Sequence, residues 1–542
     1  MKILLIYANR YFLNHPVYPF GLNLIADYLR NRGHEVQIEL PFIYDKKIHR
    51  GIDIVLNKFN PDLIGISIRN IDTAMACEKF GTWQQNGVST HFFLPDIRKT
   101  VLAVKERLPG IPVVVGGPGF SVSPEEILTY VQADYGIRGD GARPMGKLID
   151  CLDSKTDLDQ VDNLLILKEN TRVIKTSNKF STDIDLHPVQ REKSFGYAFT
   201  VSAMPVQTHY GCAMNCAYCV EPFITQKKII FRKKEKIIQE LQMIAQNYPD
   251  VSEIFFVDTE FNSPDSDFSS ALLKDILKAK LEKRFQFTSQ FLPKNMTEEY
   301  ASLLSRTGFY VILTCDSFSD TVLAENHCPY REKDILNTLA LFEKYQVNSS
   351  LNLIFGLPAE TLATMDHTIG QINHFNRKAG LFKFEYTAGA RVYKNTPLAG
   401  YMEKKDNTRF LFGEKSDNFL TPVFFSSPVS PFEIHDYVRE RLEFKIDFKP
   451  PDTEKNRAVC NIAFYADNEL FENSCREFCR ADINVKDAVF DYLFRKYNAE
   501  SRNNVFAQEI SQNFLYAVET CDSDGRFSHR TEMLHYFLSL LQ

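Results

Sequence analysis

The sequence predicts an α/β protein in which two runs of alternating strands and helices are followed by a helical region. Apolar strands alternate with amphipathic helices over residues 1–150 and again over 200–400, and helical periodicity dominates after residue 400. We therefore expect an N-terminal doubly wound parallel sheet, a linker at 151–199, a full or partial (β/α) barrel resembling the TIM architecture, and a mostly helical C-terminal domain at 401–542.

Composition narrows the functional classes. The 542 residues are 44% hydrophobic and 24% charged, which is typical of globular proteins. A net charge of −6 argues against a dedicated nucleic-acid or anionic-membrane binder. No apolar run reaches the roughly 18 residues that span a bilayer. The apolar N-terminus Met1–Tyr7 is interpreted as a first strand and not as a signal peptide, so we expect a cytoplasmic protein with mostly free thiols.

The first run contains five predicted strands and the helices between them. Ligands bind at the carboxyl ends of the strands in doubly wound sheets. The dinucleotide fingerprint G-x-G-x-x-G is absent after the first strand, which lowers the case for NAD or FAD. The predicted strands are Ile3–Tyr7, Glu35–Ile38, Leu63–Ile68, Val113–Val115 and Tyr135–Ile137, with helices such as Leu22–Asn31 and Ile97–Arg107. The candidate ligand-binding residues at the strand ends are Asn9, Arg69, Asn70, Gly116, Gly117, Arg138 and Gly139.

The second run contains six predicted strands, which suits a full or partial barrel. The linker before it contains a short hairpin. After residue 400 we predict a loop around Phe424–Pro431 and helices at Phe432–Phe444 and Val485–Tyr497. The six strands are Gln207–Tyr210, Ile254–Val257, Phe285–Ser289, Val311–Thr314, Ser350–Phe355 and Phe382–Ala388.

A cysteine-rich loop directly follows the first of these six strands. Cys212, Cys216 and Cys219 have the spacing C-x3-C-x2-C. Three thiolates on one loop can bind three irons of a cubane cluster and leave the fourth iron open to substrate. Gly211 permits a sharp turn before the loop, and Tyr218 places an aromatic ring beside the cluster. The alternatives are three unrelated buried thiols or a zinc site, but zinc usually requires four closed ligands and no fourth lies nearby.

This loop resembles the signature of the radical S-adenosylmethionine superfamily, including the aromatic residue before the third cysteine. The resemblance implies a [4Fe–4S] cluster, S-adenosylmethionine and an electron donor of the flavodoxin or ferredoxin type. In the family, a motif after the next strand binds the methionine amino group. Here that segment is Phe256–Asn262, in which Asp258 or Glu260 would make the contact, although it departs from the usual Gly-Gly-Glu.

Two later segments resemble further parts of the family. Asn352–Thr361 is similar to a later strand and turn, and Gly389–Leu398 is similar to the segment after the last barrel strand in the cobalamin-containing branch. The second resemblance places Arg391 among the expected cofactor-binding residues. The alternative for each segment is a strand-to-helix turn whose Gly and Pro serve geometry alone.

The first 150 residues resemble the cobalamin-binding domain attached to many radical S-adenosylmethionine enzymes. The motif D-x-H-x-x-G, whose His would coordinate cobalt, is absent, and His49 has the wrong spacing. The resemblance therefore implies cobalamin without a protein His ligand. Arg69 is a candidate for the lower face of the corrin, and its alternative is a salt bridge to Asp72. The similar pieces are Pro19–Leu22, Gly33–Val36, Pro61–Gly65, Val115–Pro118 and Ala133–Gly141.

Four C-terminal cysteines, Cys460, Cys475, Cys479 and Cys521, could form a second cluster site. Cys475 and Cys479 would share one helical face, but the other two lie far away in sequence. We interpret all four as ordinary semi-buried thiols.

The resemblance implies a cobalamin-dependent radical methyltransferase acting on a small-molecule or peptide substrate. The cluster would reduce S-adenosylmethionine to a 5′-deoxyadenosyl radical, and methylcobalamin would supply the methyl group to a substrate carbon. The N-terminal domain should then cover the top of the barrel. One alternative keeps the same cofactors but performs a rearrangement, cyclisation or oxidation. A second alternative is a non-catalytic cobalamin or redox sensor.

Overall fold

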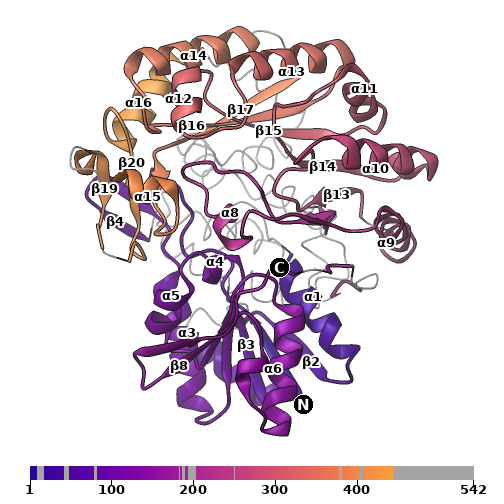
Figure 1. Ribbon diagram of the computed structural model, residues 1–542, viewed down its shortest axis with the longest axis vertical. Coiled ribbons are helices and arrows are strands. Elements are labelled where there is room, and N and C mark those ends of the chain that lie inside the picture. The colour runs from indigo at the N-terminus through magenta and orange to yellow at the C-terminus, as the bar shows by residue number, and fades with distance from the viewer. Residues whose placement is uncertain are drawn as a thin grey trace, which may run out of the picture.

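The computed structural model describes residues 1–8, 18–41, 48–77, 82–181, 183–185, 190–192, 203–249, 251–376, 381–402, 407–416 and 418–443. The chain forms two sheet-based units, one stacked on the other, with the N-terminal unit in the lower half of Figure 1.

The first sheet has the strand order β2-β1-β3-β6-β7-β8-β9, and its first five strands are parallel. These five confirm the five strands predicted for residues 1–150, with ends that differ by at most one residue. The order reverses direction between β1 and β3, so a crevice opens at their carboxyl ends. The five are β1 (Lys2–Tyr7), β2 (Glu35–Glu39), β3 (Leu63–Ser67), β6 (Val113–Gly116) and β7 (Tyr135–Ile137).

Helices cover both faces of this sheet, which explains why its strands are apolar at successive positions. In β1, Ile3 and Leu5 face one core, and Leu4 and Ile6 face the other. Burial on both faces is typical of parallel sheets. Helices α1 (Phe20–Arg30) and α6 (Ala142–Ser154) line the first core, while α2 (Ile48–Lys58), α3 (Leu94–Arg107) and α5 (Pro124–Val131) line the second.

The hairpin predicted within the linker extends the first sheet. Strands β8 (Leu164–Lys168) and β9 (Arg172–Lys175) pair antiparallel with each other, and β8 also pairs antiparallel with β7. Leu164 and Leu165 are fully buried on opposite faces of the sheet. The first structural unit therefore continues beyond residue 150.

The second sheet consists of six parallel strands in chain order, which is an open, partial barrel. Five of the predicted strands are confirmed within a few residues. The strands are β10 (Met204–Val206), β13 (Glu253–Phe256), β14 (Gln286–Phe291), β15 (Tyr310–Asp316), β16 (Ser349–Phe355) and β17 (Phe382–Ala388).

The prediction of the first barrel strand at Gln207–Tyr210 was wrong. The barrel strand is β10, which ends at Val206, and β11 (His209–Tyr210) pairs instead with β12 (Ile230–Phe231). The cause is a turn at Thr208 and His209, whose backbone N–H groups donate to the Asp258 carboxylate and not to a neighbouring strand.

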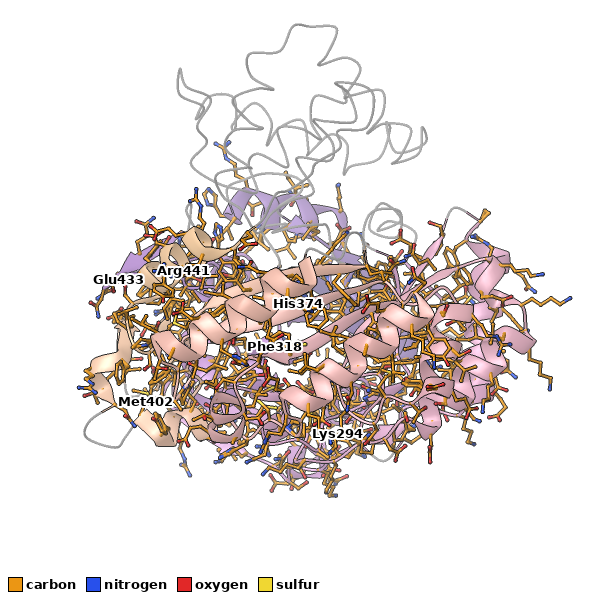
Figure 2. All side chains as sticks on the ribbon, turned by 90° about the horizontal axis from the view of Figure 1, so that it is seen from above. Lys294, Phe318, His374, Met402, Glu433 and Arg441 are labelled. Atoms are coloured by element: carbon orange, nitrogen blue, oxygen red, sulfur yellow. The ribbon has the colours of Figure 1, made fainter. Side chains whose placement is uncertain are left out.

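The outer face of the second sheet is covered by helices (Figure 1). Figure 2, seen from above, shows this outer layer, with His374 on α14 and the buried Phe318 below the helices. Stacked phenylalanines, including Phe256, Phe287 and Phe309, fill the core beneath. The helices are α9 (Lys234–Asn247), α10 (Asp267–Lys278), α11 (Glu298–Arg306), α13 (Glu332–Tyr345) and α14 (Leu362–Asn376).

After the barrel, a small antiparallel sheet connects the two units. Its order is β18 (Ala390–Arg391), β20 (Val423–Phe425) and β19 (Leu411–Gly413). The side chain of Phe424 packs with Ala76 and Val88 of the first unit, where Val88 belongs to the hairpin β4 (Trp83–Gln85) and β5 (Val88–Thr90).

The C-terminal predictions have mixed outcomes. The predicted loop around Phe424–Pro431 is wrong at its start, because Phe424 and Phe425 are buried in the central strand β20. The helix predicted at Phe432–Phe444 is confirmed as α16 (Pro431–Arg441), which follows α15 (Pro397–Met402). The helix Val485–Tyr497 and the four C-terminal cysteines lie outside the described residues. Within the described part of the chain, no helix is long and apolar enough to cross a membrane.

Candidate active site between the two sheets

A cavity of about 810 Å³ lies where the carboxyl ends of both sheets meet. The two short helices α4 (Pro118–Ser121) and α8 (Glu221–Ile224) lie between the sheets in Figure 1, and residues of both helices line the cavity. The first sheet contributes Ser67, Arg69, Gly116, Gly117 and Gly139, and the second unit contributes Gly211, Asp258, Thr259 and Gln290. One cavity therefore opens onto the ligand-binding ends of two parallel sheets.

Close backbone packing forms the first wall of the cavity. Gly117 has a φ of +100°, and a Cβ there would lie 2.7 Å from the Ile68 carbonyl oxygen. A Cβ at Gly119 would lie 2.9 Å from the Arg69 carbonyl oxygen. The loops after β3 and β6 can thus touch only because these two positions lack side chains. The absence of side chains here would also let a large ligand approach the backbone closely.

Arg69 stands on this wall as an exposed side chain at the end of β3. Within the described parts of the chain, its guanidinium has no hydrogen-bond or ion-pair partner. The alternative of a salt bridge to Asp72 was wrong, because the Asp72 carboxylate pairs with Arg391 at 2.7 Å. Arg69 is therefore free to interact with a ligand in the cavity.

The cysteine loop begins behind the opposite side of the cavity, which Tyr210 and Gly211 line directly before Cys212. Cys212 and Cys216 are buried, Cys219 is partly buried, and all three are free thiols. Burial, together with the neighbouring Cys216 thiol, raises the pKa of Cys212 to about 12. Burial and the thiols of Cys216 and Cys212 also raise the pKa of Cys219. Three free thiols on one short loop fit the donor set of an iron–sulfur cluster, whose binding would convert them to thiolates.

The first half of the loop is fixed by a tight turn. Gly211 has a φ of +103°, and a Cβ there would lie 2.1 Å from the Lys228 carbonyl oxygen. The Cys212 N–H donates to the Thr225 hydroxyl at 3.2 Å. Only glycine fits this turn, which directs Cys212 away from the strand.

The two candidate carboxylates after β13 differ in how many hydrogen bonds they already accept from the protein. The Asp258 carboxylate accepts hydrogen bonds from the Thr208 hydroxyl at 2.5 Å, from the Thr208 N–H at 2.8 Å and from the His209 N–H at 3.1 Å. Glu260 accepts one bond, from the Thr314 hydroxyl at 3.0 Å, and its Oε2 is buried without a partner. Burial raises the pKa of Glu260 well above its usual value. A bound ammonium group would satisfy this oxygen, so Glu260 fits the methionine amino group better than Asp258.

Several predicted site residues are not part of the cavity lining, and these include Glu260 and the cysteines Cys212, Cys216 and Cys219. Asn70 is exposed and is not part of the lining. Arg138 turns toward the β8–β9 hairpin, where it donates to the Thr176 carbonyl at 3.5 Å, and burial lowers its pKa. Tyr218 lies within the loop, and its hydroxyl donates to Asp316. Asn9 lies outside the described residues.

Arg391, which was predicted to bind a cofactor, lies outside the cavity lining and contacts protein groups. Its guanidinium is buried, pairs with Asp72, and donates to the carbonyls of Val392, Val423, Phe419 and Leu420. These bonds give Arg391 a structural role between the two units.

Sequence reasoning missed a group of polar residues behind the cysteine loop. Asp316, Cys328 and Tyr330 are buried there, and the Cys328 thiol and the Tyr330 hydroxyl both donate to the Asp316 carboxyl group. The position of Asp316 at the carboxyl end of a barrel strand was a usable signal. Cys328 and Tyr330 follow a helix and carry no comparable signal.

Two family models match the chain. The B12 binding domain matches residues 13–149, and the radical SAM superfamily matches residues 206–372. These ranges contain the two walls of the cavity described above.

Curated relatives and solved structures agree with this organisation. The chain is 22% identical to a tryptophan 2-C-methyltransferase of Streptomyces laurentii over 484 residues, covering 76% of each chain. It is 24% identical to an uncharacterized methyltransferase of Pyrococcus horikoshii over 399 residues, covering 71% of this chain and 78% of that one.

Among solved structures, the fold is similar to the radical S-adenosylmethionine methyltransferase TsrM of Kitasatospora setae with cobalamin and a [4Fe–4S] cluster bound. The TM-score is 0.73 at 18% identity, covering 87% of this chain and 99% of that one. It is also similar to the cobalamin-dependent radical enzyme OxsB, with a TM-score of 0.64 at 14% identity, covering 99% of this chain and 83% of that one.

The site is thus built from a B12-binding domain and a radical SAM domain, whose cofactors are cobalamin, S-adenosylmethionine and a [4Fe–4S] cluster. The chain belongs to the cobalamin-dependent radical S-adenosylmethionine enzymes.

Proposed function

We propose that this enzyme is a methyltransferase that moves a methyl group from S-adenosylmethionine, by way of cobalamin, to a carbon of its substrate. The observation that carries the proposal is a cavity that is lined both by Arg69 and by Gly211, the residue directly before the cysteine loop. When bound there, the cluster supplies an electron for cleavage of S-adenosylmethionine, and cobalamin carries the methyl group.

Each part of the cavity has a distinct role in this proposal. Cys212, Cys216 and Cys219 hold the cluster. Glu260 orients the amino group of S-adenosylmethionine, because its buried Oε2 lacks another partner. Arg69 would lie beside bound cobalamin, where its fixed positive charge would disfavour a protein or water ligand to the cobalt on that side. The residues Gly116, Gly117 and Gly139 allow the cofactor to approach the backbone closely.

The relatives support methyl transfer. Two of them are named as methyltransferases, and the chain matches each of the two over most of its length. We propose a small-molecule or peptide substrate, which would enter the space left between the cofactors. We also propose that a flavodoxin or ferredoxin supplies electrons.

The test uses full-length protein reconstituted anaerobically with iron, sulfide and cobalamin. The protein is incubated with S-adenosylmethionine deuterated in its S-methyl group, with titanium(III) citrate as reductant. Methyl transfer predicts S-adenosylhomocysteine as a product and the deuterium label in the protein-bound corrinoid fraction. The matched control changes Cys212, Cys216 and Cys219 to Ala, which should remove only the products that require the cluster.

The alternatives give different products in the same assay. Formation of 5′-deoxyadenosine without S-adenosylhomocysteine would contradict methyl transfer and favour a rearrangement, cyclisation or oxidation. Absence of both products from fully loaded protein would favour a sensor.

A further inference from the structure

We propose that Asp316 is a positioning residue that fixes the second half of the cysteine loop, Cys216–Cys219, to strand β15 and thereby sets the electronic properties of the bound cluster. This role rests on the cluster site and is independent of whether the enzyme transfers methyl groups.

The central contact is between Asp316 and Tyr218, the residue that directly precedes the third cysteine. The Tyr218 hydroxyl lies 2.8 Å from both carboxylate oxygens of Asp316. Losing a buried hydrogen bond of this kind is costly, because it leaves a polar group without a partner in the protein interior. The bond therefore connects the loop to a strand that lies 98 positions further along the chain.

Two more donors converge on the same carboxylate. The Tyr330 hydroxyl donates to Asp316 at 2.7 Å, and the Cys328 thiol donates at 3.2 Å. Asp316 is 2% exposed, and no Lys, Arg or His in the described part of the chain pairs with it. Three neutral donors thus satisfy a buried carboxyl group, and removal of one leaves the others in an altered arrangement.

The backbone of β15 departs from regular geometry to place this carboxylate. The register with β16 shifts between Thr314 and Asp316, and Asp316 has a φ of +52°. Such bulges redirect side chains at functional sites. Two residues earlier, the Thr314 hydroxyl contacts Glu260, so one strand supports both the cysteine loop and the candidate contact to S-adenosylmethionine.

Backbone hydrogen bonds hold the same half of the loop. The Ala217 N–H donates to the Asn326 carbonyl at 3.0 Å, and the Ala217 carbonyl accepts from the Leu398 N–H at 2.8 Å. These backbone bonds hold Ala217 against the residues Asn326 and Leu398, while the Tyr218 side chain holds the loop against strand β15. Cys216 and Cys219 flank these anchors on either side.

Cys328 extends the network to a cluster ligand. The Cys216 and Cys328 side chains are direct neighbours, and this contact is the largest cause of the raised pKa of Cys328. Polar groups near the ligand sulfurs of an iron–sulfur cluster tune its reduction potential. Asp316, which binds the Cys328 thiol, thus influences the surroundings of Cys216 as well as the position of Cys219.

The competing explanation is a buried polar network that stabilises the barrel and has no influence on the cluster. The two explanations differ in what a mild change would do. A structural network predicts lower stability with an unchanged cluster spectrum. A positioning role predicts a changed spectrum at equal cofactor content.

The experiment compares Tyr218→Phe and Asp316→Asn with the wild type in full-length, anaerobically reconstituted protein. The matched control is Tyr300→Phe, which removes another buried hydroxyl of the barrel, bonded to Ser269 at 2.7 Å and remote from the loop. The measurements are iron and cobalamin content, the EPR spectrum of the reduced cluster, and its midpoint potential. Circular dichroism of each variant reports folding.

Both test variants should shift the g values and the midpoint potential, or lose iron several-fold faster on dialysis, while Tyr300→Phe does neither. The effects of the double variant Tyr218→Phe/Asp316→Asn should be less than the sum of the two single effects, because both changes act on the Tyr218–Asp316 contact. If Asp316→Asn fails to fold, Tyr218→Phe alone decides. A wild-type spectrum, potential and iron retention in Tyr218→Phe would overturn the proposal, and this result would leave methyl transfer untouched.

Discussion

Arg69 combines an exposed position on the cavity wall with the absence of any partner in the described residues. A guanidinium stays charged at every working pH, so a fixed cation would face the corrin. A cation there would disfavour an axial ligand and would favour the electron-rich, reduced form of the cobalt.

Arg69→Gln should leave the fold and the iron content unchanged, because Arg69 makes no contact that stabilises the protein. It should slow methyl transfer and allow water to bind cobalt from below, seen as a change from four- toward five-coordinate cob(II)alamin in EPR. An unchanged cobalt spectrum with full activity would remove Arg69 from the mechanism.

At the residue scale, the sequence carries a signal where that signal is local. The spacing of Cys212, Cys216 and Cys219 lies within one short loop and needs no tertiary information, and the assignment of these residues as cluster ligands stays a prediction. The ion pair of Arg391 could not be predicted, because its partner Asp72 lies 319 positions away and no sequence pattern connects the two. The unpartnered Oε2 of Glu260 likewise became visible only when Thr314 was placed beside it.

At the scale of elements, the turn after β16 buries a carboxyl group that accepts few hydrogen bonds. Glu360 is 3% exposed, its Oε1 accepts from the Thr364 hydroxyl at 2.6 Å, and its Oε2 has no partner. Burial raises the pKa of Glu360 to about 7 from its ordinary value of 4.5. Between these two pH values the folded protein binds more protons than the unfolded chain, so stability falls as pH rises.

Glu360→Gln should remove this dependence on pH. Between pH 4.5 and 7, the ionisation of Glu360 should lower the free energy of unfolding of the wild type by up to about 3 kcal/mol. The Gln variant should not show this part of the decrease. Urea unfolding at several pH values measures the difference, with the exposed Glu235→Gln on α9 as control. Equal slopes against pH in Glu360→Gln and wild type would show that Glu360 is not responsible.

The small sheet β18-β20-β19 is joined to the first unit by the Asp72–Arg391 ion pair, whose side chains are 0% and 2% exposed. Removal of one partner leaves a buried charge without compensation, which typically costs about 3–5 kcal/mol. Arg391→Met should therefore lower the thermal midpoint strongly, while the cobalamin and cluster spectra of the folded fraction stay unchanged.

A specific loss of cobalamin from stably folded Arg391→Met would contradict the structural role and restore Arg391 as a cofactor ligand. The double variant Asp72→Leu/Arg391→Met should recover part of the lost stability, because it removes both buried charges.

Element prediction was reliable for strands buried on both faces and weaker elsewhere. β1, β3 and β6 are short apolar runs that terminate at polar or glycine residues, so their limits were clear. The first barrel strand was displaced because the turn at Thr208 depends on Asp258, which is 50 positions away. The strand β20 was missed because its three residues stand beside a Ser- and Pro-rich segment that favours a loop.

At the scale of the whole molecule, the sequence predicted that the N-terminal domain covers the top of the barrel. The structure confirms this, since the N-terminal unit is stacked on the carboxyl ends of the barrel strands (Figure 1), and residues from both sheets line one cavity. Ligands of parallel sheets bind at the carboxyl ends of the strands, and this rule predicted where each ligand site would lie. The rule does not specify how the two sheets face each other. That arrangement depends on contacts such as Phe424 with Val88, which come from distant parts of the sequence.

The central claim is that cobalamin and the [4Fe–4S] cluster face each other across this cavity. Pulsed EPR of protein containing cob(II)alamin and the reduced cluster tests it most directly, because both centres are paramagnetic and their dipolar coupling reports their separation. The account predicts a clear coupling that disappears when Cys212, Cys216 and Cys219 are changed to Ala while cobalamin remains bound. Two fully occupied centres without measurable coupling would contradict it.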